Sequence, residues 1–303
     1  MQGLLMLIDL ANGPAHARIA TEGAELHSWQ VGGHDLLWSR DPAWWEKSSP
    51  LLFPIVGWAN QGLVRADGVA RPMGVHGFAA ASVFTLEART AASATFILCD
   101  SAATRAVYPY AFRLALTYRL EPDRIAISLV VGNPGPRPLP YALGLHPAFR
   151  WPLAALPRED HAIVFAETET AEVPIIAPGG LFSDARRPVP LAGRRLGLDD
   201  ALFASDALCF LHARSRAFRF AAGESGPSIT LEARDFPHLA LWSKPGAPFL
   251  SMEVWTGYGD PVGYQGELAD KPGMRQLAVG AEATHGVDFI YRNGATGAAD
   301  DAA

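Results

Sequence analysis

Short strand-like runs recur along the whole chain, and this recurrence restricts the fold more than any other feature. Clusters of Gly, Pro, Asn and Asp separate one run from the next. The 303 residues include 29 Gly and 24 Pro, and no stretch of helical length shows the 3.6-residue apolar period of a helix. We therefore predict an all-β fold, a large antiparallel β-sandwich with little helix. The runs are LLMLIDL, AELHSWQV, HDLLWS, SVFTLEA, SATFILC, FRLALTYRL, RIAISLVV, ALCFLHA, AFRFAA, SITLEA, HLALWS, FLSMEVW and HGVDFIY.

The runs resume after the polar segment 173–200, so we interpret this segment as an excursion from the sheets and not as a linker. Residues 1–293 are expected to form a single β-sandwich domain. The last residues, 294–303, are small and polar and are predicted to be disordered.

Charge and hydropathy argue against several classes of partner. The net charge is −6, and close basic pairs occur only at Arg186-Arg187 and Arg194-Arg195, so neither a nucleic acid nor a membrane is expected as partner. The N-terminus does not resemble a signal peptide, and no apolar stretch approaches the roughly 20 residues of a membrane span. Cys99 and Cys209 lie inside apolar runs, which predicts buried, reduced thiols in a cytoplasmic protein.

His146 lies in the run YALGLHPAFRWP, where alternation would give it only Ala142 and Gly144 as neighbours on its face. Pro147 disfavours the helical region for the residue before it and so holds His146 extended. An imidazole fixed in this way is suited to donate or accept a proton. The alternative is a structural histidine bonded to a backbone carbonyl.

Glu253 lies in the run FLSMEVWTG, in which alternation separates Leu250, Met252 and Val254 from Ser251, Glu253 and Trp255. A glutamate is rarely buried without a partner, so this position is a candidate catalytic carboxylate in a cleft. A Trp beside a carboxylate also suits a sugar, because its ring stacks on C–H groups while the carboxylate accepts from hydroxyls. A solvated outer strand face is the alternative.

Two further positions carry weaker signals. His76 lies between Gly74 and Gly77 in MGVHGF, where glycines allow a close approach by a ligand, although a histidine in a surface turn is common. Asp206 precedes the run ALCFL, where an aspartate usually serves a turn.

Metal and phosphate motifs are missing from the sequence. There is no H-x-H, H-E-x-x-H or C-x-x-C, no G-x-S-x-G and no G-x-x-x-x-G-K-[ST]. His76, His146 and Glu253 could converge on a metal, but nothing in their spacing favours it. We predict no metal and no cofactor.

Taken together, these stretches resemble the aldose 1-epimerase (galactose mutarotase) family, and most closely its LacX-like bacterial branch. The resemblance covers nearly the whole chain, and the combination of a His-Pro motif with a Glu-x-Trp-Thr-Gly motif is specific. The similar stretches are GAELHSW, HDLLW, PLLFPIVGWANQG, MGVHGFA, YALGLHPAF, DALCF, PFLSMEVWTG and DKPGMRQLAVGAEATHGVDF.

The resemblance implies a cofactor-independent mutarotase that opens and closes a hexose ring. It makes Glu253 the base for the anomeric hydroxyl and His146 the acid for the ring oxygen, and it makes His76 a sugar contact. The family aspartate that holds sugar hydroxyls maps onto Asp206, with Asp199 and Asp200 as rivals. The space beside His146 is then interpreted as room for the hexose ring.

The chain departs from the family where many relatives carry an arginine after the FP motif, because Trp58, Ala59 and Asn60 stand there instead. Trp58 and Trp255 are expected to contact the sugar. Val254 replaces a frequent proline, which concerns backbone stiffness more than chemistry.

The alternatives left open are a hexose 6-phosphate mutarotase, a sugar-binding or sensor protein without activity, and a large-sandwich lyase or glycosidase. A phosphorylated substrate would need cations, for which Arg65, Arg71 and Lys244 are candidates, and a free hexose is preferred. The protein is expected to be a monomer or a homodimer.

Overall fold

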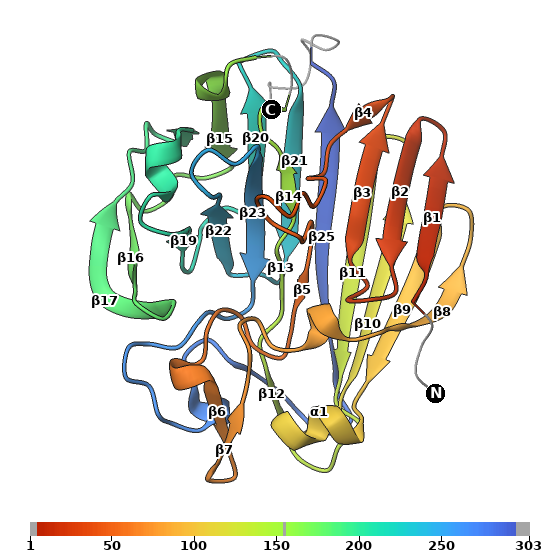
Figure 1. Cartoon of the computed structure of the whole chain (residues 1–303), viewed down its shortest axis with the longest axis vertical. Helices are drawn as coiled ribbons and strands as arrows, with labels where there is room; N and C mark the ends of the chain where they lie inside the picture. The colour runs from red at the N-terminus through yellow and green to blue at the C-terminus, as the bar shows by residue number, and fades with distance from the viewer. Residues whose placement is uncertain (1–4, 154–155, 295–303) are drawn as a thin grey trace.

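A nine-stranded antiparallel sheet forms one layer of the molecule (Figure 1). The structure, a computed structural model, describes residues 5–153 and 156–294. Burial alternates along strands such as β9 and β11, as expected for strands with one face on the core. In spatial order the sheet contains β18 (Arg195–Gly197), β15 (His161–Phe165), β20 (Ala217–Ala222), β21 (Ser228–Arg234), β25 (Glu282–Arg292), β11 (Arg124–Gly132), β10 (Arg113–Leu120), β9 (Ser93–Cys99) and β8 (Thr85–Arg89).

Two further antiparallel sheets lie across the core from the nine-stranded sheet. One is four-stranded: β1 (Leu7–Asn12), β2 (Ala15–Ala20), β3 (Leu26–Val31) and β4 (His34–Asp35). The other is six-stranded and carries the site described below: β19 (Leu208–Phe210), β22 (His238–Trp242), β23 (Phe249–Trp255), β13 (Gly144–Leu145) and β5 (Leu51–Leu52), with β14 (Ala148–Arg150) also paired to β23.

Aromatic contacts join these layers. Phe289 of β25 lies with its ring centroid 6.2 Å from that of Trp29 in β3 and 5.3 Å from that of Phe149 in β14. Phe165 of β15 and Phe210 of β19 lie 5.0 Å apart. Large rings bury much apolar area each, so these contacts tie both smaller sheets to one continuous core.

Smaller elements connect the sheets. The one α-helix of the described residues, α1 (Ala102–Val107), begins at a capping box formed by Ser101 and Thr104. The two-stranded pairs are β12 (Leu139–Tyr141) with β24 (Arg275–Leu277), β16 (Glu172–Ala177) with β17 (Leu181–Pro188), and β6 (Leu63–Ala66) with β7 (Val69–Pro72). The 3₁₀ turns are η1 (Asn60–Gly62), η2 (Ala79–Ala81), η3 (Arg158–Asp160), η4 (Asp200–Phe203) and η5 (Leu268–Asp270).

The prediction of a large antiparallel β fold with little helix is confirmed. The prediction that residues 173–200 leave the sheets is correct for the β16–β17 hairpin, which forms a separate two-stranded sheet. It is wrong for Arg195–Gly197, which pairs into the nine-stranded sheet as β18. The expectation that Cys99 is buried is wrong: it ends β9 on the outer face, whereas Cys209 is buried. Of the predicted tail, residues 295–303 lie outside the described residues. No helix among the described residues has the length and hydropathy needed to span a membrane.

Candidate active site

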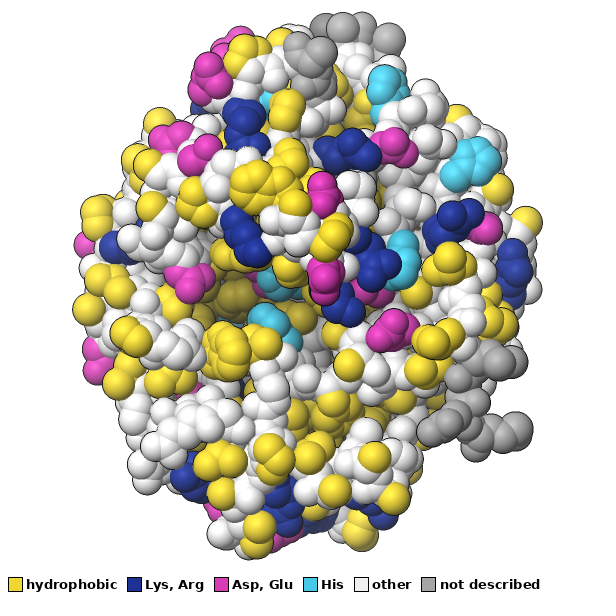
Figure 2. Space-filling model, in the orientation of Figure 1, with side chains coloured by type: hydrophobic (Ala, Val, Ile, Leu, Met, Phe, Trp, Pro, Cys, Tyr) yellow, Lys and Arg dark blue, Asp and Glu magenta, His cyan; other side chains and the backbone are white. Residues whose placement is uncertain are grey.

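A pocket of about 470 Å³ opens over the six-stranded sheet. Strands β19, β22 and β23 contribute to it, and the β16–β17 hairpin and loops near residues 45, 58 and 76 complete its wall. Figure 2 shows the surface hollowed near its centre, with hydrophobic and histidine side chains at the opening. The six residues named from the sequence all line this pocket: Trp58, His76, His146, Asp206, Glu253 and Trp255.

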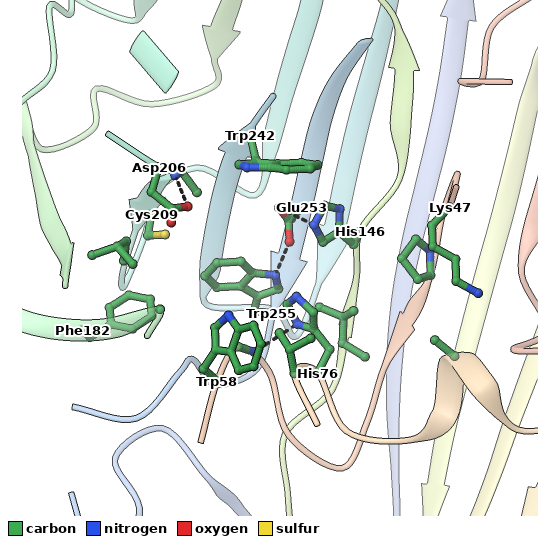
Figure 3. A pocket seen from close by; sticks show the side chains of 18 of the residues that line it. Lys47, Trp58, His76, His146, Phe182, Asp206, Cys209, Trp242, Glu253 and Trp255 are labelled. Atoms are coloured by element: carbon green, nitrogen blue, oxygen red, sulfur yellow. Dashed lines mark hydrogen bonds and ion pairs between the residues drawn. The ribbon is translucent and has the colours of Figure 1, made fainter. Parts of the chain in front are cut away.

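His146 and Glu253 face each other at the centre of the pocket (Figure 3). His146 Nε2 lies 3.2 Å from Glu253 Oε1, and both side chains are buried. The indole Nε1–H of Trp255 donates to the other carboxylate oxygen, Oε2, at 3.0 Å. On the far side of the imidazole, Nδ1 lies 2.8 Å from Ser251 Oγ. Both ends of the pair are therefore held by neighbours on β23.

Strand pairing brings these two residues together. Along β23, Leu250, Met252 and Val254 belong to the main core, which leaves Ser251, Glu253 and Trp255 on the pocket side. β13 and β14 pair with β23 before and after His146, and the N–H of Met252 donates to Pro147 O between them at 2.9 Å. His146 thus lies at the break between two short strands, directly beside the carboxylate.

Burial shifts both members of the pair toward their neutral forms. It raises the pKa of Glu253 to about 8; Asp206 adds to the rise and the Trp255 hydrogen bond opposes it. Burial, together with the neighbouring His76, lowers the pKa of His146 well below its ordinary value. A carboxyl and an imidazole that both titrate so far from their usual ranges form a candidate acid–base pair.

His76 adds a fixed hydrogen-bond donor. Its Nδ1 accepts the backbone N–H of Gly57 at 3.0 Å, so in the neutral ring the proton is on Nε2. Burial and the ammonium of Lys271 lower its pKa to about 4, which keeps the ring neutral at pH 7. The close passage of Gly77 past Phe53, where a Cβ would lie 2.3 Å from the carbonyl oxygen, fixes this turn.

A buried ion pair holds the loop that carries Trp58. Lys271 Nζ lies 2.9 Å from Asp260 Oδ1, and Asp260 Oδ2 accepts the N–H of Asn60 at 2.8 Å. The N–H of Asp260 in turn donates to Trp58 O at 2.8 Å. Trp58 is 45% exposed and lies over Gly180, where a Cβ would be 1.9 Å from the indole Cδ1.

Of the three candidate aspartates, only Asp206 lines the pocket in the described part of the chain. It lies on one side of the central pair, beside Cys209 (Figure 3), and its Oδ1 accepts the N–H of Ala207 at 2.6 Å. Asp199 instead caps η4, and Asp200 forms an ion pair with Arg158 at 2.7 Å. The two rivals therefore have structural partners.

Sequence reasoning missed several pocket residues. The ring of Trp45 lies 4.9 Å from that of His146, and the ring of Trp242 lies 5.5 Å from it. Trp242 ends a run that the sequence identified as a strand, whereas Phe182 lies in the segment interpreted as an excursion and Trp45 lies in an irregular segment without a pattern. Lys47 also lines the pocket, on the opposite side of the pair from Asp206 (Figure 3).

Glu25 anchors the segment that carries Trp45 and Lys47. It is buried, and its Oε1 accepts the N–H groups of Ser48 at 2.6 Å and Ser49 at 3.1 Å. Burial acts to raise its pKa, but the His27 ring, whose Nε2 lies 3.8 Å from Oε2, together with these bonds outweighs burial and holds the pKa of Glu25 at about 2. Its Oε2 lies 3.7 Å from Lys47 Nζ.

The space beside His146 is not open to a ligand at Gly144. A Cβ there would lie 2.8 Å from Trp255 Cδ1 and 3.0 Å from Leu52 Cδ1, and Ala142 packs in the same cluster. The small residues make room for the indole of Trp255 and not for a hexose ring, so the interpretation of the space beside His146 as room for the sugar is wrong. Trp255 lines the pocket, whereas Gly144 and Ala142 do not. In the described residues, no three His, Cys, Asp or Glu side chains are grouped to hold a metal ion.

Comparison with known proteins places the chain in a family. A sequence model of the aldose 1-epimerase family matches residues 6–269. The plasmid-encoded protein LacX of Lactococcus lactis subsp. lactis is 32% identical over 283 residues, which cover 90% of this chain and 95% of LacX. A galactose mutarotase-like protein of Lactobacillus casei has a TM-score of 0.88 at 28% identity, with 95% of this chain and all of that one covered. A galactose mutarotase related enzyme of Lactobacillus acidophilus also has a TM-score of 0.88, at 27% identity, over 95% of this chain and 98% of its own. The chain belongs to the aldose 1-epimerase family.

Proposed function

We propose that the protein is a mutarotase that interconverts the α and β anomers of a free hexose. The observation that carries the proposal is the contact between His146 Nε2 and Glu253 Oε1, 3.2 Å apart in a pocket lined by four tryptophans. The ring oxygen and the anomeric oxygen of a cyclic sugar are bonded to the same carbon. An acid and a base that serve these two oxygens together must therefore lie side by side.

The proposed reaction returns every proton it moves. Glu253 as carboxylate takes the proton of the anomeric hydroxyl while His146 gives its Nε2 proton to the ring oxygen. The C1–ring oxygen bond breaks and the carbonyl forms. After rotation about C1–C2, His146 removes the proton from the former ring oxygen as it attacks the other face of the carbonyl, and Glu253 reprotonates the carbonyl oxygen. The His76 Nε2–H and Asp206 bind hydroxyls, and the indoles stack on the sugar.

A panel of sugars tests the proposal. Mutarotation of freshly dissolved α-glucose, α-galactose and other free hexoses is followed by polarimetry, with the spontaneous rate subtracted. Catalysis of at least one free hexose is expected. Binding seen by calorimetry without catalysis of any panel sugar would favour the sugar-binding alternative and contradict the enzyme.

A hexose 6-phosphate is the second candidate, and Lys47 favours it. It is the one Lys or Arg side chain that lines the pocket within the described residues. Of the cations considered from the sequence, Arg71 is bonded to carbonyls of its own hairpin and Lys244 to Trp44 O. Because Lys47 is alone and faces Glu25, we rank the free hexose first. A kcat/KM that is higher for glucose 6-phosphate, and that falls in Lys47→Gln but not in Arg71→Gln, would reverse this order.

A further inference from the structure

Ser251 makes two contacts that together determine where the proton of His146 resides. The side chain is fully buried, and its Oγ donates to Pro147 O at 3.0 Å. The same oxygen lies 2.8 Å from His146 Nδ1. A hydroxyl has one hydrogen, so an Oγ that donates to the carbonyl can only accept from the ring. His146 Nδ1 therefore carries a hydrogen.

This assignment has a consequence at the other ring nitrogen. In the neutral ring with its hydrogen on Nδ1, Nε2 has a lone pair and faces Glu253 Oε1 at 3.2 Å. Glu253 Oε2 is occupied by the indole N–H of Trp255. The contact at 3.2 Å then needs one proton between the two atoms, on Oε1 or on Nε2. Moving this proton across the contact converts the neutral pair into the carboxylate and imidazolium that start ring opening.

We propose that Ser251 is a positioning residue that holds His146 in its Nδ1–H form, so that the His146–Glu253 pair contains one exchangeable proton. The inference rests on the proposed function for its kinetic part. A ring free to turn its hydrogen onto Nε2 would leave Nδ1 unprotonated against the serine. Neutral histidine would then donate to the carboxylate, and removal of a proton from the anomeric hydroxyl would leave no imidazolium to complete the transfer.

Other charged groups around the ring leave this arrangement undisturbed. His76 lies with its ring centroid 5.7 Å from that of His146, and its own Nδ1 is occupied by Gly57. The rings packed on His146 from β22 and from the irregular segment before β5 are the uncharged indoles of Trp242 and Trp45. Asp206 and Cys209 interact with Glu253 and not with the His146 ring. The buried Glu25 makes no hydrogen bond to His146 and affects its pKa only by its charge. The ammonium of Lys271 affects the pKa of His76.

Ser251→Ala tests the proposal, with Ser243→Ala as its matched control. Ser243 is also buried, and its Oγ donates to Phe249 O of β23, 2.7 Å away. Losing the partner that orients a metal-bound histidine reduces activity about ten- to a hundredfold, and we expect a fall in kcat of the same order for the best panel sugar in Ser251→Ala. KM should change less than about twofold, and Ser251→Thr, which keeps the hydroxyl, should restore part of kcat. Ser243→Ala should keep the parent kcat.

Nitrogen NMR of the imidazole gives a readout that a merely structural serine would not move. In ¹⁵N-histidine-labelled parent protein, His146, assigned by its loss in His146→Asn, should show a protonated Nδ1, and Ser251→Ala should show a mixture of tautomers. An unprotonated Nδ1 in the parent, or a Ser251→Ala variant with parent kcat and parent pH profile, would overturn the proposal. Absence of turnover by the parent on all sugars would contradict the proposed function, while the NMR result would still decide the tautomer.

Discussion

At the scale of single residues, the chemistry of the pocket follows from what surrounds three titratable side chains. Glu253 and His146 are desolvated together, and His76 is kept neutral by burial and by Lys271. The identities of the first two follow from strand alternation and from the proline after the histidine. The direct contact between these two residues cannot be predicted from such patterns, because it depends on the pairing of β13 and β14 with β23. Pairing partners far apart in sequence leave no local signal.

Removing the acid or the base should abolish most of the catalysis. Glu253→Gln keeps the shape but cannot accept a proton, and His146→Asn keeps a donor without acid chemistry. General acid–base groups typically contribute about 10² to 10⁴ each, so each variant should lose at least about a hundredfold in rate by polarimetry. The double variant should be little worse than the poorer single one. Glu169→Gln, a buried carboxylate bonded to Ser215 N outside the pocket, is the control. A Glu253→Gln variant with the parent rate would show that another residue is the base.

The pH dependence of kcat/KM should show the loss of the single exchangeable proton of the His146–Glu253 pair. The proton is lost as pH rises through the raised pKa of Glu253, about 8, so kcat/KM should fall about tenfold per unit above that pH. A second proton is added only below the ordinary pKa of histidine, because that of His146 is lowered, so activity should persist below about pH 6.5. Trp255→Phe removes a hydrogen bond that lowers the pKa of Glu253 and should move the alkaline fall to higher pH. A loss of kcat/KM that begins as the pH rises above about 4 to 5 would contradict the assignment of this proton to a Glu253 with a raised pKa.

At the scale of elements, β23 shows how far a sequence pattern reaches. Its bounds coincide with the predicted run, and its two faces separate as alternation requires. The alternation along β23 could not show whether its polar face is solvated or lines a cleft, because the side chains that cover this face come from other segments of the chain. The β16–β17 hairpin supplies Phe182, and an irregular segment supplies Trp45. Strand β2, whose buried positions are mostly alanines, was missed because it buries little apolar area in a local window. The run predicted around His146 is present, but it is divided into the short strands β13 and β14.

The contact between the β16–β17 turn and Trp58 can be tested with two adjacent glycines. Gly179 and Gly180 both have positive φ, so Ala at either position should cost roughly 1–2 kcal/mol of stability. Only at Gly180 would the new Cβ displace the indole of Trp58; at Gly179 it would meet Leu181 Cγ at 3.9 Å. KM should therefore rise about two- to tenfold in Gly180→Ala alone, the equivalent of one aromatic contact, with kcat nearly unchanged. Equal KM values for the two variants would remove Trp58 from substrate binding.

At the scale of the whole molecule, the composition and the rhythm of strands and turns indicated the sandwich. The buried pair of Asp260 and Lys271 had no such signal, because neither residue lies in a periodic run. This pair connects the loop before η1 to the segment after η5, and so it fixes one wall of the pocket to the rest of the fold.

Asp260→Asn should destabilise the protein by about 3–5 kcal/mol, because it leaves a buried ammonium without its counter-ion. Chemical denaturation, with the midpoint and slope compared with the parent, measures the loss. Asp123→Asn is the control, since Asp123 pairs with Arg292 at 2.6 Å on the surface and should lose less than about 1 kcal/mol. A loss in Asp260→Asn as small as in this control would mean that Lys271 reaches water.

The unequal exposure of the two thiols gives the protein a built-in handle for spectroscopy. Cys99 is exposed at the end of β9 and does not line the pocket, whereas Cys209 lies in the pocket wall with a pKa raised by burial and by Glu253. At pH 7 a maleimide dye should attach once, at Cys99, without any engineered substitution. Mass spectrometry of the tryptic peptides checks the site, and equal labelling of Cys209 would contradict its burial. A fluorophore placed there would report unfolding without entering the cavity where the sugar is proposed to bind.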